Sequence, residues 1–223
     1  RSTLFPYTTL FRSTNFVAWG VLLLIASYFV GNLDFAYIVV KAVRGEDIRN
    51  FGSGNAGTTN VLRTMGLKYA GLVLLLDALK GSLCIVIARL LESHLGLSPW
   101  WTAGTGIAVL CGHNWPALLK FRGGKGTATS IGLFLVYDWR IALICIAVGL
   151  ILLVIFKMVS LSSMMGMTIL PFVALGFFGA HNLPALALTI FMALSTDIQH
   201  RSNIKRILNG TESKIGQRVD MKK

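Results

Sequence analysis

The chain has 223 residues, of which 54% are hydrophobic and only 13% are charged, and its formal net charge is +12 at pH 7. Soluble globular domains carry about 25% charged residues, so this composition excludes an ordinary soluble domain and indicates an integral membrane protein. A nucleic-acid-binding role needs a soluble basic face. None is visible, because most of the basic residues lie between and after long apolar runs.

The first residues, RSTLFPYTTLFRS, differ in character from the rest of the chain. They lack an initiator Met, contain T-L-F twice and have R-S at both ends. The stretch T-L-F-R-S is also what a sequencing adapter encodes when it is translated. We therefore expect residues 1–13 to be a non-native or artefactual segment and residues 14–223 to form a single polytopic membrane domain.

Apolar runs follow one another along the remaining chain and predict an all-α integral membrane protein with about seven transmembrane helices. A helix that spans a bilayer needs about 20 predominantly apolar residues. Two of the runs, 99–112 and 124–137, are shorter than this, so six or five spans are the alternatives. The runs are residues 16–40, 66–91, 99–112, 124–137, 140–157, 161–179 and 182–198.

The distribution of Lys and Arg predicts how these helices are oriented. Most basic residues follow the first, third, fifth and seventh runs, and all four positions lie on one side if every run crosses the membrane. Loops rich in Lys and Arg normally stay in the cytoplasm. The sequence therefore predicts an outside N-terminus and a cytoplasmic C-terminus.

Three polar segments fall on this predicted inner side, and the first is F-G-S-G-N-A-G-T-T-N-V-L-R, residues 51–63. Its glycines allow backbone N–H groups to approach an anion closely, and Arg63 can bind phosphate with two hydrogen bonds. The alternative interpretation is structural: Thr59 or Asn60 caps the helix that begins the second span. The two interpretations are compatible, because helix N-termini bind anions.

The second polar segment is H-N-W-P-A-L-L-K-F-R-G-G-K-G-T, residues 113–127. A lysine between glycines suggests phosphate binding, but Lys125 is not part of a P-loop, because the earlier glycine of that motif is missing. The alternative is a tight turn between spans, with His113 and Asn114 at a helix end near the membrane interface.

The third polar segment, residues 200–212, follows the last run directly. His200 and Asn203 are three residues apart and share a face of a helix, and Glu212 is placed to pair with an arginine. A basic segment attracted to anionic lipid headgroups is the alternative interpretation.

Two further features are weaker as signals. Asp77 and Lys80 are three residues apart within the second run and can form an ion pair, which is either functional or structural. The serines of K-M-V-S-L-S-S, which are Ser160, Ser162 and Ser163, either contribute hydroxyls to the site or cap a helix, and a cap is the favoured interpretation. The three cysteines show no metal-ligand or disulfide spacing; they are Cys84, Cys111 and Cys145.

The three polar segments resemble the motifs of the bacterial acyl-phosphate:glycerol-3-phosphate acyltransferase family, PlsY. The pattern G-S-G-N-x-G-x-T-N-x-x-R is matched from Gly52 to Arg63, and H-N-W-x-x-x-L-x-F-x-G-G-K-G from His113 to Gly126. The pattern H-R-x-N-I-x-R-L-x-x-G-T-E is matched from His200, with Ile207 in place of leucine. The resemblance covers residues 15–215 and implies a seven-helix enzyme of the bacterial cytoplasmic membrane, with its active site facing the cytoplasm.

The resemblance also implies a reaction. A fatty acyl group passes from acyl phosphate to the sn-1 hydroxyl of glycerol 3-phosphate, giving lysophosphatidic acid and inorganic phosphate in phospholipid biosynthesis. Besides the two substrates the expected partners are membrane lipids; no cofactor, metal or nucleic acid is expected. None of the histidines begins the H-x-x-x-x-D motif of thioester-using glycerolipid acyltransferases, so that class is disfavoured.

Acyl phosphate is already activated, so positioning and electrostatics suffice for catalysis. We expect the catalytic residues to be Ser53, Lys125, His200 and Asn203, with His200 as a general base or as a positioning group. A serine nucleophile is the less favoured version. The expected substrate-binding residues are Gly52, Gly54, Asn55, Thr59, Asn60, Arg63, His113, Asn114, Gly123, Gly124, Gly126, Arg201 and Glu212.

Two other classes of protein remain as alternatives. A small anion transporter uses similar glycine-rich loops, although the polar segments gather at one face and no inverted repeat is evident. A membrane scaffold that gathers acidic lipids is the other.

Overall fold

The computed structural model describes residues 7–217, with side chains from residue 16 onward, and within this part of the chain it is entirely helical. Residues 1–6 lie outside the described residues, and the prediction that residues 1–13 are a non-native segment stays a prediction. The helices are α1 Tyr7–Gly31, α2 Phe35–Arg44, α3 Thr58–Met65, α4 Leu67–Leu95, α5 Pro99–Asn114, α6 Thr127–Tyr137, α7 Trp139–Phe156, α8 Val159–Thr168, α9 Leu170–Phe178, α10 Leu183–Gln199 and α11 Arg201–Leu208.

The apolar runs of the sequence coincide with helices, but two of them are interrupted. The first run breaks after Gly31, and Asp34 starts α2 by accepting a hydrogen bond from the backbone N–H of Tyr37 at 2.9 Å. The run 161–179 breaks at Ile169, and Pro171 then lies in the first turn of α9, where its missing N–H costs no hydrogen bond. Neither break was predicted.

Length and composition confirm the membrane class. Within the described residues four segments are long and apolar enough to cross a bilayer: Phe16–Arg44, Leu67–Leu95, Trp139–Phe156 and Val159–Phe178. The predicted number of seven spans and their orientation stay predictions, because the remaining helices are shorter.

Close helix packing depends on glycines at two crossings. α4 runs along α6, where a Cβ on Gly81 would collide with the carbonyl of Thr129 and one on Gly132 with the carbonyl of Ala78. α1 and α5 meet in the same way through Gly31 and Gly112. Small residues let helix backbones approach closely in membranes, where packing rather than the hydrophobic effect holds helices together.

Helices α7 to α10 form a second group, which packs beside the α1–α5 and α4–α6 pairs. α7 packs on α8, and α10 contacts α5, α8 and α9. Buried residues such as Leu133, Phe134, Leu188 and Met192 fill the centre. The outer faces of α4 and α7 expose leucine, isoleucine and valine side chains, as expected for helices that face lipid.

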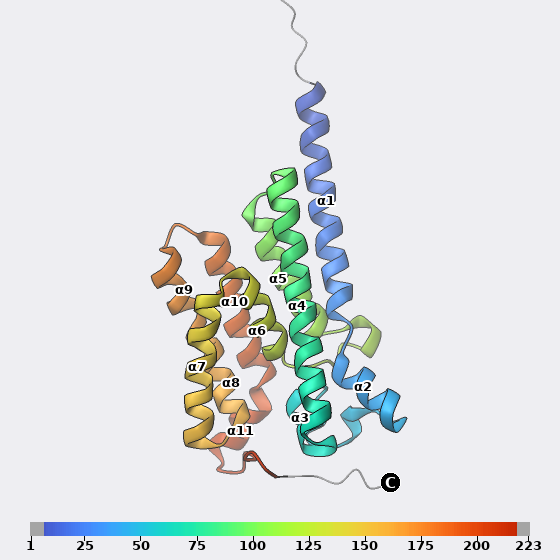
Figure 1. Cartoon of the computed structure of the whole chain (residues 1–223), viewed down its shortest axis with the longest axis vertical. Coiled ribbons are helices and arrows are strands. Elements are labelled where there is room, and N and C mark those ends of the chain that lie inside the picture. Colours follow the sequence, from blue (N-terminus) through green and yellow to red (C-terminus); the bar gives the residue numbers. More distant parts are fainter. Residues whose placement is uncertain (1–6, 218–223) are drawn as a thin grey trace, which may run out of the picture.

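The polar segments gather at one end of the bundle. Figure 1 shows α2, α3 and α11 at the same end. Arg49 connects two of the segments there: its Nη1 donates to the carbonyl of Leu119 at 2.8 Å and to that of Arg122 at 3.3 Å. The Asp47 carboxylate, 2.7 Å away, holds the other side of the same guanidinium. The loop before α3 is thus fastened to the link between α5 and α6.

Candidate active site

The loop before α3 takes its shape from one buried amide. Asn60 Oδ1 accepts from the backbone N–H of Ser53 at 2.9 Å, and its Nδ2 donates to the carbonyls of Phe51 at 2.9 Å and Asn55 at 3.0 Å. Gly52 follows with φ of +56°, and a Cβ there would collide with Asn60 Oδ1. The Asn60 side chain therefore holds the loop together.

The capping prediction for this segment is wrong. Gly57 is the N-cap of α3 and makes no side-chain capping bond, and α4 begins only after Gly66. Asn60 cannot cap, because its amide is used by the preceding loop. The buried hydroxyl of Thr58 has no hydrogen-bond partner among the described residues. The N–H groups at the start of α3 are thus not satisfied by a side chain.

The glycines of the second segment are required by close contacts. The Gly124 N–H donates to the carbonyl of His113 at 3.1 Å. A Cβ on Gly124 would collide with His113 Nε2 and lie 2.5 Å from the carbonyl oxygen of Ala56, and one on Gly123 would collide with the His113 carbonyl. This turn therefore packs between the end of α5 and the first polar segment. It does more than link two helices, which was the alternative interpretation.

Two neighbouring polar residues complete this turn. Gln199, the last residue of α10, donates through Nε2 to the carbonyl of Asn114 at 3.0 Å and to that of Gly124 at 3.3 Å. Both polar side-chain atoms of Asn114 are buried without a partner among the described residues, and a Cβ on Gly126 would lie 2.8 Å from Asn114 Oδ1. Gly126 is the N-cap of α6 and offers no side-chain capping bond.

The second and third segments meet in a continuous polar cluster. Lys125 Nζ donates to Asn203 Oδ1, and Asn203 Nδ2 donates to Glu212 Oε1 at 2.8 Å. The same carboxylate accepts from Ser160 Oγ at 2.9 Å and from Arg206 Nε at 2.7 Å. The prediction that Glu212 pairs with an arginine is confirmed. We call these five residues the Lys125–Glu212 cluster.

Burial and hydrogen bonding together set the ionisation of this cluster. Burial lowers the pKa of Lys125 to about 8, while the charge of Glu212 acts in the opposite direction. Burial also lowers the pKa of Arg63, which interacts electrostatically with Glu212 and Arg206. Burial alone would raise the pKa of Glu212, but its three hydrogen-bond donors outweigh that effect and lower it. Three cations thus surround a single carboxylate, and the balance favours an incoming anion.

His200 lies beside the cluster as a neutral base. Its Nδ1 lies 2.8 Å from the carbonyl of Thr196, and a carbonyl only accepts, so Nδ1 carries the proton and the lone pair is on Nε2. Burial and then the nearby charge of Lys125 lower the His200 pKa to about 4. His200 and Asn203 are both buried, in agreement with the predicted shared face.

Some predicted residues lie at the edge of this arrangement. Ser53 and Gly54 are exposed in the loop before α3, and Asn55 and Thr59 are half-buried there. Arg201 is exposed on α11 and does not belong to the Lys125–Glu212 cluster. The catalytic role of Ser53 and the substrate-binding roles of the other residues stay predictions.

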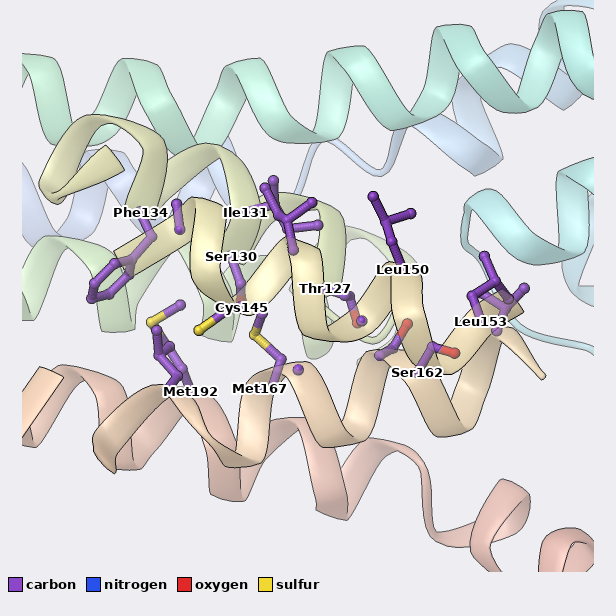
Figure 2. A pocket seen from close by; sticks show the side chains of 17 residues that line it. Thr127, Ser130, Ile131, Phe134, Cys145, Leu150, Leu153, Ser162, Met167 and Met192 are labelled. Carbon is purple, nitrogen blue, oxygen red and sulfur yellow. The ribbon is translucent and has the colours of Figure 1, made fainter. Parts of the chain in front are cut away.

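An apolar groove begins next to the cluster. It has a volume of about 150 Å³ and lies between α6, α7 and α8, with Met192 of α10 at its inner wall. Thr127, two residues after Lys125, is at the start of α6, and Phe134 lies two turns further along the same helix (Figure 2). Ser162 and Ser163 of α8 also line it. Local sequence patterns do not indicate this groove, since its walls come from five separate helices, α6 to α10.

Two residues of the site were missed in the sequence, and for a third, Ser160, the less favoured interpretation holds. Ser160 was expected to cap a helix, but Met158 is the N-cap of α8 and the Ser160 hydroxyl bonds to Glu212. Gln199 and Arg49 had no assigned role. The position of Gln199 directly before His200, at the end of an apolar run, was the available signal. Within residues 16–217 no group of three or more His, Cys, Asp or Glu side chains is arranged to hold a metal ion.

These features define a class of protein: a helical membrane protein with a cationic polar cluster at the start of an apolar groove, suited to a substrate with an anionic head and a long apolar chain. The family model for glycerol-3-phosphate acyltransferase matches residues 21–210. The chain belongs to the glycerol-3-phosphate acyltransferase family, and it is a membrane acyltransferase.

Individual relatives agree with this assignment. A glycerol-3-phosphate acyltransferase of Thermoanaerobacter sp. (strain X514) is 45% identical over 204 residues, covering 92% of this chain and 100% of the relative. A glycerol-3-phosphate acyltransferase of Clostridioides difficile (strain 630) is 42% identical, covering 90% of this chain and 97% of the relative. The crystal structure of PlsY (YgiH), an integral membrane glycerol 3-phosphate acyltransferase, in its glycerol 3-phosphate form has a TM-score of 0.81 at 34% identity, covering 88% of this chain and 96% of that one. The structure of the lysophosphatidic acid form of PlsY has a TM-score of 0.76 at 33% identity.

Proposed function

We propose that this acyltransferase moves a fatty acyl group from acyl phosphate to the sn-1 hydroxyl of glycerol 3-phosphate, releasing lysophosphatidic acid and inorganic phosphate for phospholipid biosynthesis. The observation that carries the proposal is the position of Lys125, which bonds to Asn203 and stands two residues before the start of the apolar groove. An acyl phosphate joins the same two chemistries, a phosphate and an alkyl chain, through one reactive carbonyl.

Two phosphates need two sets of donors, and the site offers them. The N-termini of α3 and α6 both follow glycines and carry no side-chain cap, so their N–H groups and positive dipole ends are available to anions. Arg63 is in the last turn of α3, and Lys125 precedes α6 by two residues. In this proposal Arg63 and Lys125 bind the substrate phosphates and reduce the repulsion between them.

The chemical step needs no covalent enzyme intermediate. The sn-1 hydroxyl oxygen attacks the acyl carbonyl carbon, the bond from that carbon to the phosphate oxygen breaks, and the hydroxyl proton goes to His200 Nε2 or to the departing phosphate. Lys125 balances the charge that develops on the leaving group. The Asn203 amide, fixed by Glu212 at 2.8 Å, holds Lys125 and orients the glycerol hydroxyl. Ser53 supplies a hydroxyl donor at the acyl-phosphate end.

A comparison of acyl donors tests the proposal. Purified protein is incubated with radiolabelled glycerol 3-phosphate and, in separate reactions, palmitoyl phosphate, palmitoyl-CoA or palmitoyl acyl carrier protein. We expect labelled lysophosphatidic acid from palmitoyl phosphate alone. Equal turnover of a thioester would refute the donor assignment. Trapping of an acyl group on Ser53 by rapid quench would replace direct transfer with a covalent route. Uptake of glycerol 3-phosphate into sealed vesicles without product would favour the transporter.

The proposed location is the bacterial cytoplasmic membrane, with the site facing the cytoplasm. Single cysteines replacing Lys120, beside the site, and His181, in the link between α9 and α10, test this in a background in which the native cysteines are replaced. A membrane-impermeant maleimide should label the Lys120 position in inverted vesicles and the His181 position in intact cells. The reverse pattern would overturn the orientation.

A further inference from the structure

A buried ionic group inside α4 has no part in the function described so far. The Asp77 carboxylate and the Lys80 ammonium lie 2.8 Å apart, and their side chains are 1% and 3% exposed. The predicted pairing is confirmed. Charged side chains within a membrane-spanning helix are costly and are found where they serve a purpose. Asp77 and Lys80 are both buried, and their contacts are with groups of the protein.

Lys80 joins three parts of the bundle. Its Nζ donates to the carbonyl of Leu33 at 2.7 Å and to that of Gly31 at 3.3 Å, where α1 ends, and lies 2.9 Å from Nδ1 of His113 at the end of α5. An ammonium group can only donate. His113 Nδ1 therefore accepts, and the ring carries its proton on Nε2. The ion pair thus fixes both the orientation and the tautomer of the His113 ring.

The ring of His113 in turn supports the turn that carries Lys125. Gly124 is so close to His113 Nε2 that a Cβ on Gly124 would collide with it. The Gly124 N–H donates to the His113 carbonyl at 3.1 Å. The next residue, Lys125, bonds to Asn203 of α11. A continuous path of contacts therefore runs from the middle of α4 to the Lys125–Glu212 cluster.

We propose that Lys80, held by Asp77, is a positioning residue of the acyltransferase: it fixes the His113 ring, and the ring fixes the Gly124–Lys125 turn. Lys80 touches no substrate and acts only through His113. The inference rests on the proposed role of Lys125. It also assigns His113 a supporting role at its Nδ1 side, since that atom is occupied by Lys80 rather than by substrate.

The test needs variants that leave no unpaired charge in the membrane. Lys80→Met alone would strand the Asp77 carboxylate, which strongly destabilises a buried pair. The double variant Asp77→Asn/Lys80→Met removes both charges. Asp77→Asn/Lys80→Gln also does so but retains an amide that can donate to His113. The matched control is Ser82→Ala on the same helix, which loses a 2.7 Å hydrogen bond to the carbonyl of Gly132 on α6 and no contact of His113.

A double-mutant cycle with His113→Ala separates positioning from general stability. We expect Asp77→Asn/Lys80→Met to unfold in detergent at a temperature close to that of Ser82→Ala, yet to lose about 10- to 100-fold in kcat, the loss that a displacement of about 1 Å produces. Asp77→Asn/Lys80→Gln should recover part of the lost kcat, because its amide can still donate to His113. Adding Asp77→Asn/Lys80→Met to His113→Ala should cost less than about twofold more, because residues that act through one another are not additive.

Each other result has a definite meaning. Losses that multiply in the combined variant, or activity of Asp77→Asn/Lys80→Met within about twofold of the wild type, would overturn the inference. If His113→Ala turns over too slowly, the same cycle is measured by the rise in unfolding temperature with glycerol 3-phosphate, which needs no turnover. If Asp77→Asn/Lys80→Met does not fold, the cycle is run with Asp77→Asn/Lys80→Gln. Lys125→Met is assayed in parallel: full activity of that variant refutes the proposed role of Lys125 in binding phosphate, whereas the cycle tests the positioning by Lys80.

Discussion

Replacing Lys125 by Met removes one cation from the site while nearly preserving the volume of the side chain. Hydrogen bonds to charged groups contribute about 1.5–3 kcal/mol in buried surroundings, and Lys125 is largely buried. If Lys125 binds phosphate in the transition state, Lys125→Met should lower kcat/KM by about 10- to 150-fold, at 1.4 kcal/mol for each factor of ten. The assay is the conversion of radiolabelled glycerol 3-phosphate with palmitoyl phosphate as donor.

The pH dependence provides a second measurement on the same residue. Burial lowers the pKa of Lys125 to about 8, so the ammonium is present below that pH and is lost above it. Because kcat/KM reports the free enzyme, it should fall as the pH rises through about 8. In kcat the fall should appear at higher pH, since bound phosphate stabilises the charged form. Lys125→Arg keeps its charge throughout this range and should not show the fall near pH 8.

A matched control lies on the same link. Lys120 is exposed, five residues before Lys125, so Lys120→Met removes the same formal charge without touching the Lys125–Glu212 cluster and should remain within about twofold of the wild type. Activity of Lys125→Met within about threefold of the wild type, or an equal loss in Lys120→Met, would refute the assignment of Lys125 to phosphate.

Three further predictions follow from the site. Burial lowers the pKa of His200 to about 4, so the imidazole stays neutral from pH 5 to 8. The fall of kcat/KM on the acid side, near pH 6, then comes from protonation of the substrate phosphate, and His200→Gln should retain it. Loss of this fall in His200→Gln would contradict the assignment. Glu212→Gln keeps the shape of the side chain but weakens its contact with Arg206. Thermal unfolding should show that the free energy of unfolding falls by about 1–2 kcal/mol. An unchanged unfolding temperature would exclude Glu212 as the centre of the cluster. Gly149→Leu puts a side chain into the groove and should slow palmitoyl phosphate at least about fivefold more than a short-chain donor. Gly176→Leu on α9, where a Cβ meets nothing, is its control, and equal slowing of both donors would mean that the acyl chain lies elsewhere.

The positions of the helices could be predicted from the sequence because apolar composition is a local property. Every apolar run became helix. The breaks after Gly31 and at Ile169 were missed, since they lie inside runs that are apolar on both sides. The number of spans is harder, because α5, α6 and α10 are shorter than a bilayer-spanning helix normally is, and their length alone does not decide whether they cross.

The candidate site was predictable to the extent that its residues occur in ordered motifs. Lys125, Asn203 and Glu212 are indeed connected. What failed were roles that depend on distant partners. Ser160 bonds to a carboxylate 52 positions later in the chain, and the Asn60 amide is used by carbonyls up to 12 positions earlier. Local rules assign both residues to helix caps, because capping is the commonest local use of a short polar side chain.

The place of Glu212 in the chain bears on how the enzyme matures. This carboxylate is the last member of the Lys125–Glu212 cluster to be synthesised, and it follows all the apolar helices. The backbone N–H of Ile215 then donates to the carbonyl of Lys157 at 2.7 Å, which fastens the segment after Glu212 to the link between α7 and α8. A nascent chain that has already inserted every helix therefore still lacks the anion that orients Asn203. A chain cut before Glu212 keeps every apolar helix but lacks this anion, so it should insert into the bilayer without becoming active.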